Sequence, residues 1–297
     1  MHVKKEAPAP APESDPPAAE LMPEVAEMVV SLERRSMYRE VTLALRSGLR
    51  DASADFSFLR VRGLRSLLKS LNSFSQSDDV VHLFRHSQSH PQLQVVPVLF
   101  ENSLHQLKGD PVVKLDSIFG VEPMKLSSPA TDAEVALALR VLEGCCLLHQ
   151  ESVALAHQKK SVKVLLNILS TRGILERGLC LDALISLMLD SSANQTDFEA
   201  CHGIERIAEL IAEEQGDENI RLKCGEFLLL LIGHVNGRRE GGPLATIYED
   251  IRRFLGEKCA SLIWAASQFG STLDPHERQT ALRIQARRVL ESLELID

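Results

Sequence analysis

The segment from Ala133 to Val235 repeats one short pattern three times, and this repetition decides the fold. Leu142–Leu148 reads LEGCCLL, Leu181–Leu187 reads LDALISL and Gly225–Leu231 reads GEFLLLL. In each copy an acidic second residue leads into a largely apolar run. The copies begin at residues 142, 181 and 225, which are 39 and 44 residues apart. A helical unit of this kind cannot bury its apolar face alone, so neighbouring units must stack.

The segments that precede these copies recur as well. Val162–Leu169 (VKVLLNIL) resembles Ile204–Ile211 (IERIAELI), which begins 42 residues later, at 204 instead of 162. A period of about 40 residues built from helical patterns is typical of armadillo and HEAT repeats. The sequence therefore predicts an all-α fold, an armadillo/HEAT-like helical-repeat solenoid (α-α superhelix).

Composition narrows the class of protein. Hydrophobic residues make up 44% of the 297 residues and aromatic residues only 4%, so we expect a core of Leu, Val, Ile and Ala. The net charge of −8 argues against a binder of nucleic acid or of anionic membranes, since both need a basic surface. The longest unbroken apolar run, Phe227–Ile232, is too short to insert across a bilayer.

The chain divides into a tail and one helical domain. Residues 1–20 are rich in Ala and Pro and have little to bury, so we expect a disordered tail. They also lack the apolar core of a secretory leader. Residues 21–297 form the predicted armadillo-like helical domain, with the strongest repeats in 131–236. The six cysteines lie in apolar patterns, which favours reduced thiols in the cytosol or nucleus.

Apolar spacing and turn signals predict the individual helices. Before the repeats we expect helices from Pro23 to Leu49, from Phe58 to Leu71, after Asp78 and from Gln92 to Leu107, then a long loop over 108–130 whose role stays open. Thr131 and Glu134 form a cap-like pair at the start of the repeats. Within and after them we expect turns at Gly173, Asn194, Gly203, Gly216 and 237–243, a helix over Leu244–Phe269 and a last helix from Asp274 to about Ile296.

Several of these segments, in this order, resemble the cell division control protein 14 family, a component of the septation initiation network that is unrelated to the phosphatase of similar name. The resembling segments are Leu93–Asn102, Leu139–Ser152, Leu165–Leu169, Leu181–Leu184 with Phe198–Ile204, and Glu218–Leu228.

This resemblance implies a non-catalytic protein. Members of the family accompany a Ste20-like (germinal-centre-type) kinase in the signalling cascade that triggers cytokinesis. The resemblance thus implies a kinase regulatory subunit in the cytoplasm, at the spindle pole or division site, with the nucleus not excluded.

The residues themselves contain little that points to catalysis. Cys145, Cys146 and His149 share a helix face and would suit a metal, but one cluster without a second ligand pair favours apolar packing and a helix cap. Cys201 and His202 adjoin in sequence, and neighbours in a helix do not face each other. Phosphate-loop, zinc-protease and nucleophile-elbow motifs are absent from the sequence. We therefore expect no enzyme and no cofactor or metal.

Charged residues in the repeats are the candidates for partner binding. Glu143, Asp182 and Glu226 take matching places in the three copies, near the start of the last helix of each unit, and would form an acidic row for a basic partner segment. The alternative is that each acid only stabilises the first turns of its own helix. Arg221 and Lys223 would contact the same partner or pair with Glu226.

Two alternatives to a kinase-binding scaffold stay open. One is a general armadillo-type adaptor for basic peptides such as nuclear-import signals, although one tryptophan, Trp264, is few for that class. Trp264 itself would either anchor a partner or pack the end of the domain. The other is a Cys- or His-dependent enzyme, which a thiol-reactivity and metal assay would detect.

Overall fold

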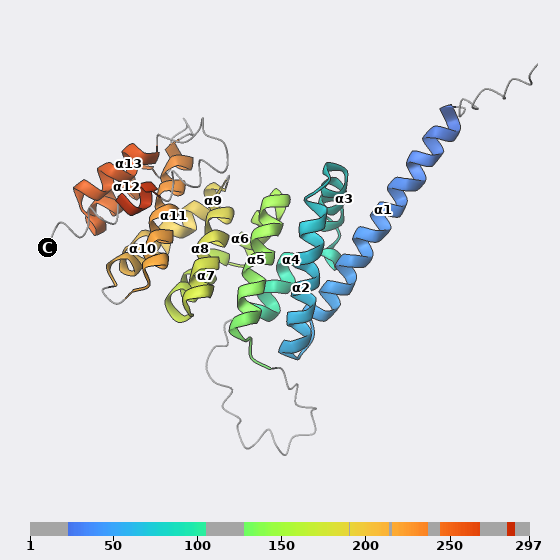
Figure 1. Cartoon of the computed structure of the whole chain (residues 1–297), viewed down its shortest axis with the longest axis horizontal. Helices are drawn as coiled ribbons and strands as arrows, with labels where there is room; N and C mark the ends of the chain where they lie inside the picture. Colours follow the sequence, from blue (N-terminus) through green and yellow to red (C-terminus); the bar gives the residue numbers. More distant parts are fainter. Residues whose placement is uncertain are drawn as a thin grey trace, which may run out of the picture.

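Helices make up all the regular structure among the described residues, which include no strand. The computed structural model describes residues 23–104, 128–189, 191–213, 216–236, 244–267 and 284–288. Figure 1 shows the helices stacked in chain order, from α1 at one end to α12 and α13 at the other. The all-α prediction is confirmed. The predicted tail, the 237–243 connection and most of the 108–130 loop and of the last helix lie outside these ranges.

The N-terminal helices follow the predicted pattern closely. They are α1 (Pro23–Ala52), α2 (Ser57–Phe74) and α3 (Asp78–Gln88). Two glycines let α1 and α2 approach closely: a Cβ on Gly63 would lie only 2.3 Å from the Ala52 nitrogen and 2.6 Å from the Gly48 carbonyl oxygen. Any larger residue at Gly63 would push the two backbones apart.

The segment predicted as one helix over Gln92–Leu107 is instead broken into short pieces. These are η1 (Pro91–Leu93), α4 (Val95–Val98) and the π-helix η2 (Leu99–Ser103). The break falls at Gln94, whose ψ of 122° is extended. The buried side chain of Gln88 stabilises this break between the helices. It donates to the Leu93 carbonyl at 2.8 Å and accepts from the Val95 amide at 3.0 Å.

The repeats form helices in the expected order. They are α5 (Asp132–Leu148), α6 (Gln150–Gln158), α7 (Ser161–Thr171), α8 (Ile174–Met188), α9 (Ser192–Ala200), α10 (Gly203–Ala212) and α11 (Glu218–Asn236). Thr131 caps α5 as predicted, accepting from the Glu134 amide at 3.3 Å. Gly173 likewise precedes α8 and marks a turn.

Two residues with left-handed backbone conformation lie at matching places of the sequence repeat. Lys160 ends the turn between α6 and α7 with φ 55°, and His202 ends the turn between α9 and α10 with φ 56°. These are the only non-glycine residues with positive φ in the described part of the chain. Their numbers differ by the same 42 residues that relate Val162 to Ile204 in sequence. The same backbone conformation therefore recurs at matching places.

Two predicted boundaries are wrong. Asn194 lies inside α9 rather than in a turn, and its buried side chain donates to the Leu187 carbonyl at the end of α8. It thus satisfies a carbonyl that the helix end leaves without a partner. The single helix predicted over Leu244–Phe269 is two, α12 (Leu244–Leu255) and α13 (Glu257–Ser267). Gly256 separates them with φ 84°, the left-handed conformation that commonly ends a helix.

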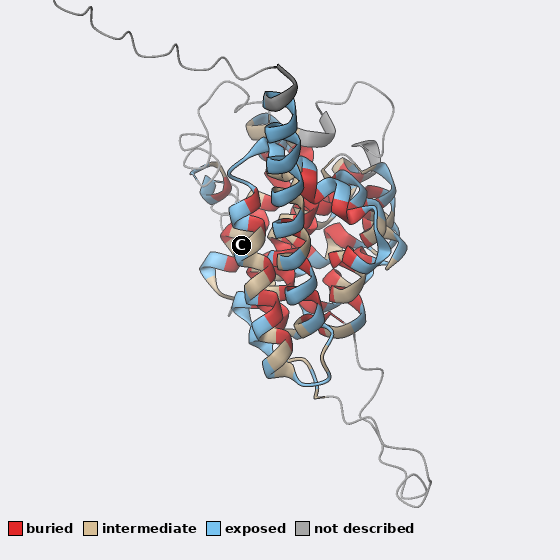
Figure 2. Cartoon of the chain, turned by 90° about the vertical axis from the view of Figure 1, so that its right-hand side faces the viewer, coloured by how far each residue is buried: buried red, intermediate tan, exposed pale blue. Residues whose placement is uncertain are grey.

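The helices pack as two rows. In the first, α2, α5, α8, α11 and α13 each contact the next, and in the second α4, α6, α7, α9, α10 and α12 do the same. Figure 2 shows the buried residues on the faces between helices, whereas residues 26–36 of α1 are exposed. No helix in the described residues is both long and apolar enough to cross a membrane.

Candidate functional site

The predicted partner-binding acids lie on three consecutive helices of the first row. Glu143 is on α5, Asp182 on α8 and Glu226 on α11, and α8 packs against both other helices. The stacking brings these helices side by side, as the matching places in the repeats predicted. All three acids are partly exposed.

Their position within each helix corrects one prediction. Glu143, Asp182 and Glu226 lie in the middle or second half of their helices, not near the start. The first turns hold other acids: Asp132 and Glu134 in α5, Glu176 in α8 and Glu218 in α11. Because the helix dipole acts within about one turn of the end, it does not account for the three mid-helix acids.

Lys223 of α11 ties two of the stacked helices together. Its ammonium group forms an ion pair with the Asp182 carboxylate of α8 and also donates to the Gly178 carbonyl at 3.0 Å. The side chains of Lys223 and Asp182 are 32% and 34% exposed, so the pair lies at the surface, accessible from one side. The row is therefore not purely acidic, since a lysine lies within it.

Glu143 occupies an unfavourable position for a negative charge. Burial raises the pKa of its carboxyl, and the nearby negative charge of Asp182 raises it further. The positive charges of Lys223 and Arg140 oppose this shift only in part. Arg140, one helical turn before Glu143, was not among the predicted site residues, although its i−3 spacing is visible in the sequence. The acid at 143 is thus held where ionisation is disfavoured.

Arg221 reaches the end of a neighbouring helix of the second row. Its Nε donates to the Ile211 carbonyl at 2.9 Å, next to the C-terminal end of α10. Residues two apart on a helix point to different sides, so Arg221 and Lys223 face different neighbours. We call Arg140, Glu143, Asp182, Lys223 and Glu226 the charged face.

Cys145, Cys146 and His149 are buried at the end of α5. Burial raises the pKa of Cys146 to about 12 and that of Cys145 well above its ordinary value. His149 lies between α5 and α6, with Nδ1 2.9 Å from the Ser152 hydroxyl and Nε2 2.7 Å from the Glu151 carboxylate. Within the described ranges, no three His, Cys, Asp or Glu side chains are placed to hold a metal.

The second Cys–His pair has a different setting from the one expected. Cys201 and His202 lie in the turn after α9, not within a helix. The His202 ring is exposed and lies 3.9 Å from the Glu205 carboxylate. Trp264 on α13 is 38% exposed and meets Tyr248 of α12 edge-on at 5.7 Å, so it both packs and remains accessible.

Comparison with known proteins identifies a family resemblance. Residues 112–234 match the model of the family described as cell division control protein 14, SIN component. The match confirms the resemblance inferred from the sequence and includes Glu143, Asp182, Lys223 and Glu226. It covers less than half of the chain and leaves out the segment Leu93–Asn102. No curated protein and no solved structure matches the chain.

Proposed function

We propose, from the similarity of residues 112–234 to this septation-network family, that the chain is a non-catalytic scaffold or regulatory subunit in septation signalling. The family match supports a septation-related role. The partner that we propose is a Ste20-like (germinal-centre-type) kinase, which binds the charged face of α5, α8 and α11. The matched residues include most of these three helices.

One observation carries the choice of surface: Glu143 is half-buried beside a second acid, Asp182, on the neighbouring helix. The helix dipole does not account for these two charges, because both lie beyond the first turn of their helices. A charge kept in an unfavourable position is typical of functional sites. A Lys or Arg side chain of the partner would offset the repulsion between the Glu143 and Asp182 carboxylates and the cost of burying the Glu143 charge.

The packing supports a scaffold rather than an enzyme. We propose that the two rows of helices form an armadillo-like array, since matching helices of successive units contact one another. Arrays of this kind present corresponding residues along one continuous surface. On this proposal the protein acts in the cytoplasm, at the spindle pole or division site, by positioning its kinase and not by chemistry of its own.

A binding experiment with a charge swap tests the proposal. A purified Ste20-like kinase that includes its flanking tail would be titrated against the immobilised chain. Glu143→Lys and Glu226→Lys should each weaken binding, mainly by slowing association, and more so at low salt, where the Debye length exceeds the ~8 Å of physiological buffer. Glu209→Lys on α10, in the second row, is the matched control and should bind as the parent does.

The double variant Asp182→Lys with Lys223→Asp separates stability from recognition. It restores an ion pair between α8 and α11 with the charges exchanged, so the fold should melt close to the parent while kinase binding falls. A swapped variant that binds with parental affinity would show that the kinase docks elsewhere. Equally tight binding of an unrelated basic peptide would favour a general adaptor for basic segments.

A further inference from the structure

A surface groove that includes several arginines and histidines lies between α1 on one side and α3 and η1 on the other, far in sequence from the charged face. One part is lined by Ser31, Arg34, Arg35, Tyr38, His82, Leu83 and His86. A second part is lined by Tyr38, Thr42, Arg46, His90, Pro91, Gln92 and Leu93. Tyr38 lines both parts, and no acidic residue lines either of them.

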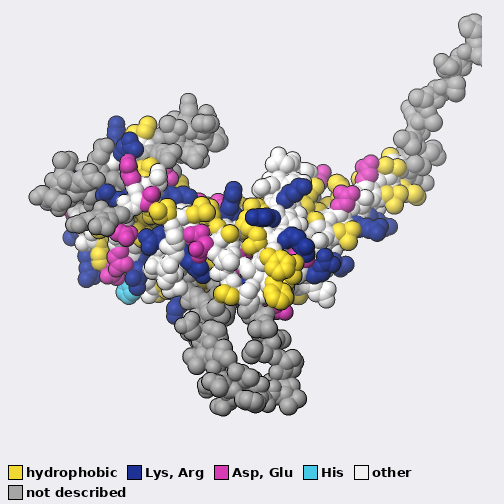
Figure 3. Space-filling model, turned by 60° about the horizontal axis from the view of Figure 1, so that its bottom comes forward, with side chains coloured by type: hydrophobic (Ala, Val, Ile, Leu, Met, Phe, Trp, Pro, Cys, Tyr) yellow, Lys and Arg dark blue, Asp and Glu magenta, His cyan; other side chains and the backbone are white. Residues whose placement is uncertain are grey.

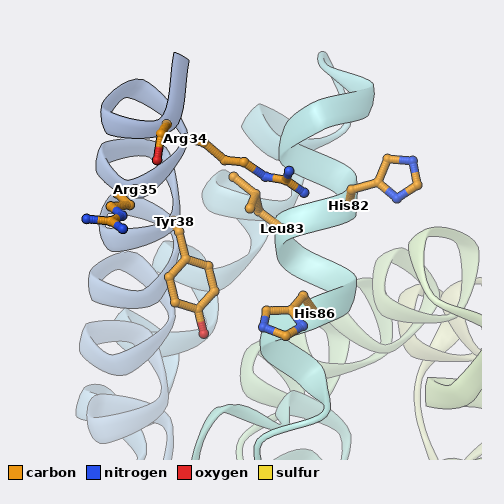
Figure 4. A pocket seen from close by; sticks show the side chains of 7 residues that line it. Arg34, Arg35, Tyr38, His82, Leu83 and His86 are labelled. Carbon is orange, nitrogen blue, oxygen red and sulfur yellow. The ribbon is translucent and has the colours of Figure 1, made fainter. Parts of the chain in front are cut away.

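The two walls of the first part carry different side chains: arginines and Tyr38 on α1, histidines on α3. Figure 4 shows Arg34 and Tyr38 reaching from α1 toward α3, where His86 faces them, while Arg35 and His82 lie at the outer sides. The Tyr38 and His86 rings lie 5.7 Å apart and those of His86 and His90 5.6 Å apart.

The arginines of the groove are available for a ligand. No ion pair joins Arg34, Arg35 or Arg46 to another residue that the structure describes, and all three are exposed. The neighbouring acids of α1, Glu33 and Glu40, do not line either part of the groove. Such a concentration of unpaired cations contrasts with the net charge of −8 for the whole chain. Figure 3, a view of one face, shows Lys and Arg side chains recurring over the α1 half.

We propose that this groove binds a phosphorylated serine or threonine peptide segment of a partner protein. A phosphate ester offers about two negative charges and three acceptor oxygens, and the fork of a guanidinium matches it with paired hydrogen bonds. Clusters of arginine are a recurring solution for phosphopeptide recognition. The apolar side chains of Leu83 and Leu93 would contact the residues that flank the phosphate.

The dimensions favour a peptide over a small anion. The lining residues of α1 extend from Ser31 to Arg46, which at 1.5 Å per helical residue spans about 22 Å. An extended chain of roughly six or seven residues covers that length. The acidic net charge disfavours nucleic acid, and a groove between two helices fits a single chain better than a flat membrane surface.

Fluorescein-labelled degenerate peptides with a fixed central phosphoserine or phosphothreonine, and their unphosphorylated counterparts, provide the test. Fluorescence anisotropy with the full chain should show binding of the phosphorylated pool only. The double variant Arg34→Ala with Arg46→Ala should weaken that binding about tenfold or more, because it removes charge-assisted hydrogen bonds. Arg34→Lys should recover only part of it, since an ammonium lacks the fork.

Arg206→Ala on α10 is the matched control, an exposed arginine remote in sequence from the groove, and should leave the affinity unchanged. Arg34 and Arg46 are both exposed, so the double variant should have the same melting temperature as the parent. Equal binding of phosphorylated and unphosphorylated pools, no binding of either, or an unaffected double variant would each overturn the proposal. So would binding of phosphatidylserine–phosphatidylcholine vesicles in place of the peptides.

Discussion

Arg60 on α2 and Glu134 on α5 form a buried ion pair, with Nε and Oε1 2.7 Å apart, although 74 residues separate them in sequence. Their side chains are 4% and 0% exposed. The remaining donors of Arg60 reach the Ala54, Asp55 and Ser128 carbonyls, and the Ser57 hydroxyl donates to Glu134. This network joins α2, which lies outside the family match, to the first helix of the repeats.

Loss of this pair should destabilise the protein strongly. Glu134→Ala leaves the Arg60 guanidinium buried without its carboxylate, which costs about 3–5 kcal/mol of unfolding free energy. The exposed pair Arg62–Asp51, with 2.8 Å between Nε and Oδ2, is the control, and Asp51→Ala should lose far less. Urea denaturation of both variants measures the difference. Similar losses would mean that burial of the Arg60 pair has no energetic consequence.

Two leucines of α11 separate core from surface. Leu228 is fully buried whereas Leu230 is 41% exposed. Leu228→Asp should therefore prevent stable folding, since a carboxylate in the shared core has no partner. Leu230→Asp should lower the melting temperature only slightly. Soluble expression and thermal melting report the outcome, and comparable behaviour of the two variants would contradict this placement of α11.

The Glu143 carboxyl should make stability depend on pH in a defined direction. Its raised pKa means that the folded state favours the protonated form, so ionisation at neutral pH costs stability. The stabilisation is fully present below the unfolded pKa of about 4 and is lost as pH rises through the folded pKa. Glu143→Gln should thus be more stable than the parent at pH 7, with the gain vanishing near pH 4.

A companion variant checks the sign of that effect. Asp182→Asn removes the carboxylate that pairs with Lys223, so it should lower stability at pH 7 while Glu143→Gln raises it. Urea unfolding at both pH values compares them. A Glu143→Gln variant that is less stable than the parent at pH 7 would show that Arg140 and Lys223 outweigh burial and Asp182.

The thiols should differ sharply in reactivity. Burial raises the pKa of Cys145, Cys146, Cys180 and Cys224, and Cys259 is also buried, whereas Cys201 is partly exposed. A thiol reagent such as Ellman's reagent should react with one cysteine in the folded protein and with all six in denaturant. Cys201→Ser should remove the fast reaction. Rapid modification of a second thiol would reopen the Cys-dependent enzyme alternative.

Local patterns in the sequence were sufficient to place most helices. Thr131 with Glu134 marked the start of α5, and Gly173 the turn before α8. Local chemistry was not sufficient where a distant or buried side chain intervened. The Gln88 side chain stabilises the break at Gln94 by accepting from the Val95 amide. The Asn194 side chain, where a turn was predicted, lies in a helix and donates to the Leu187 carbonyl at the end of α8. Glycine at 256 ends a helix only because its φ is positive, which the residue type permits but does not require.

By itself the sequence indicated the all-helical class, the 42-residue spacing that Lys160 and His202 follow, and four residues of the charged face, Glu143, Asp182, Lys223 and Glu226. Periodicity and capping depend on neighbours within a few residues, so they can be inferred from the chain alone. Tertiary structure decided that Lys223 neutralises Asp182, that Glu143 ionises unfavourably and that Arg60 meets Glu134. Those outcomes depend on burial and on charges brought together by stacking, because Coulomb and desolvation energies vary with distances in space and not with separation along the chain.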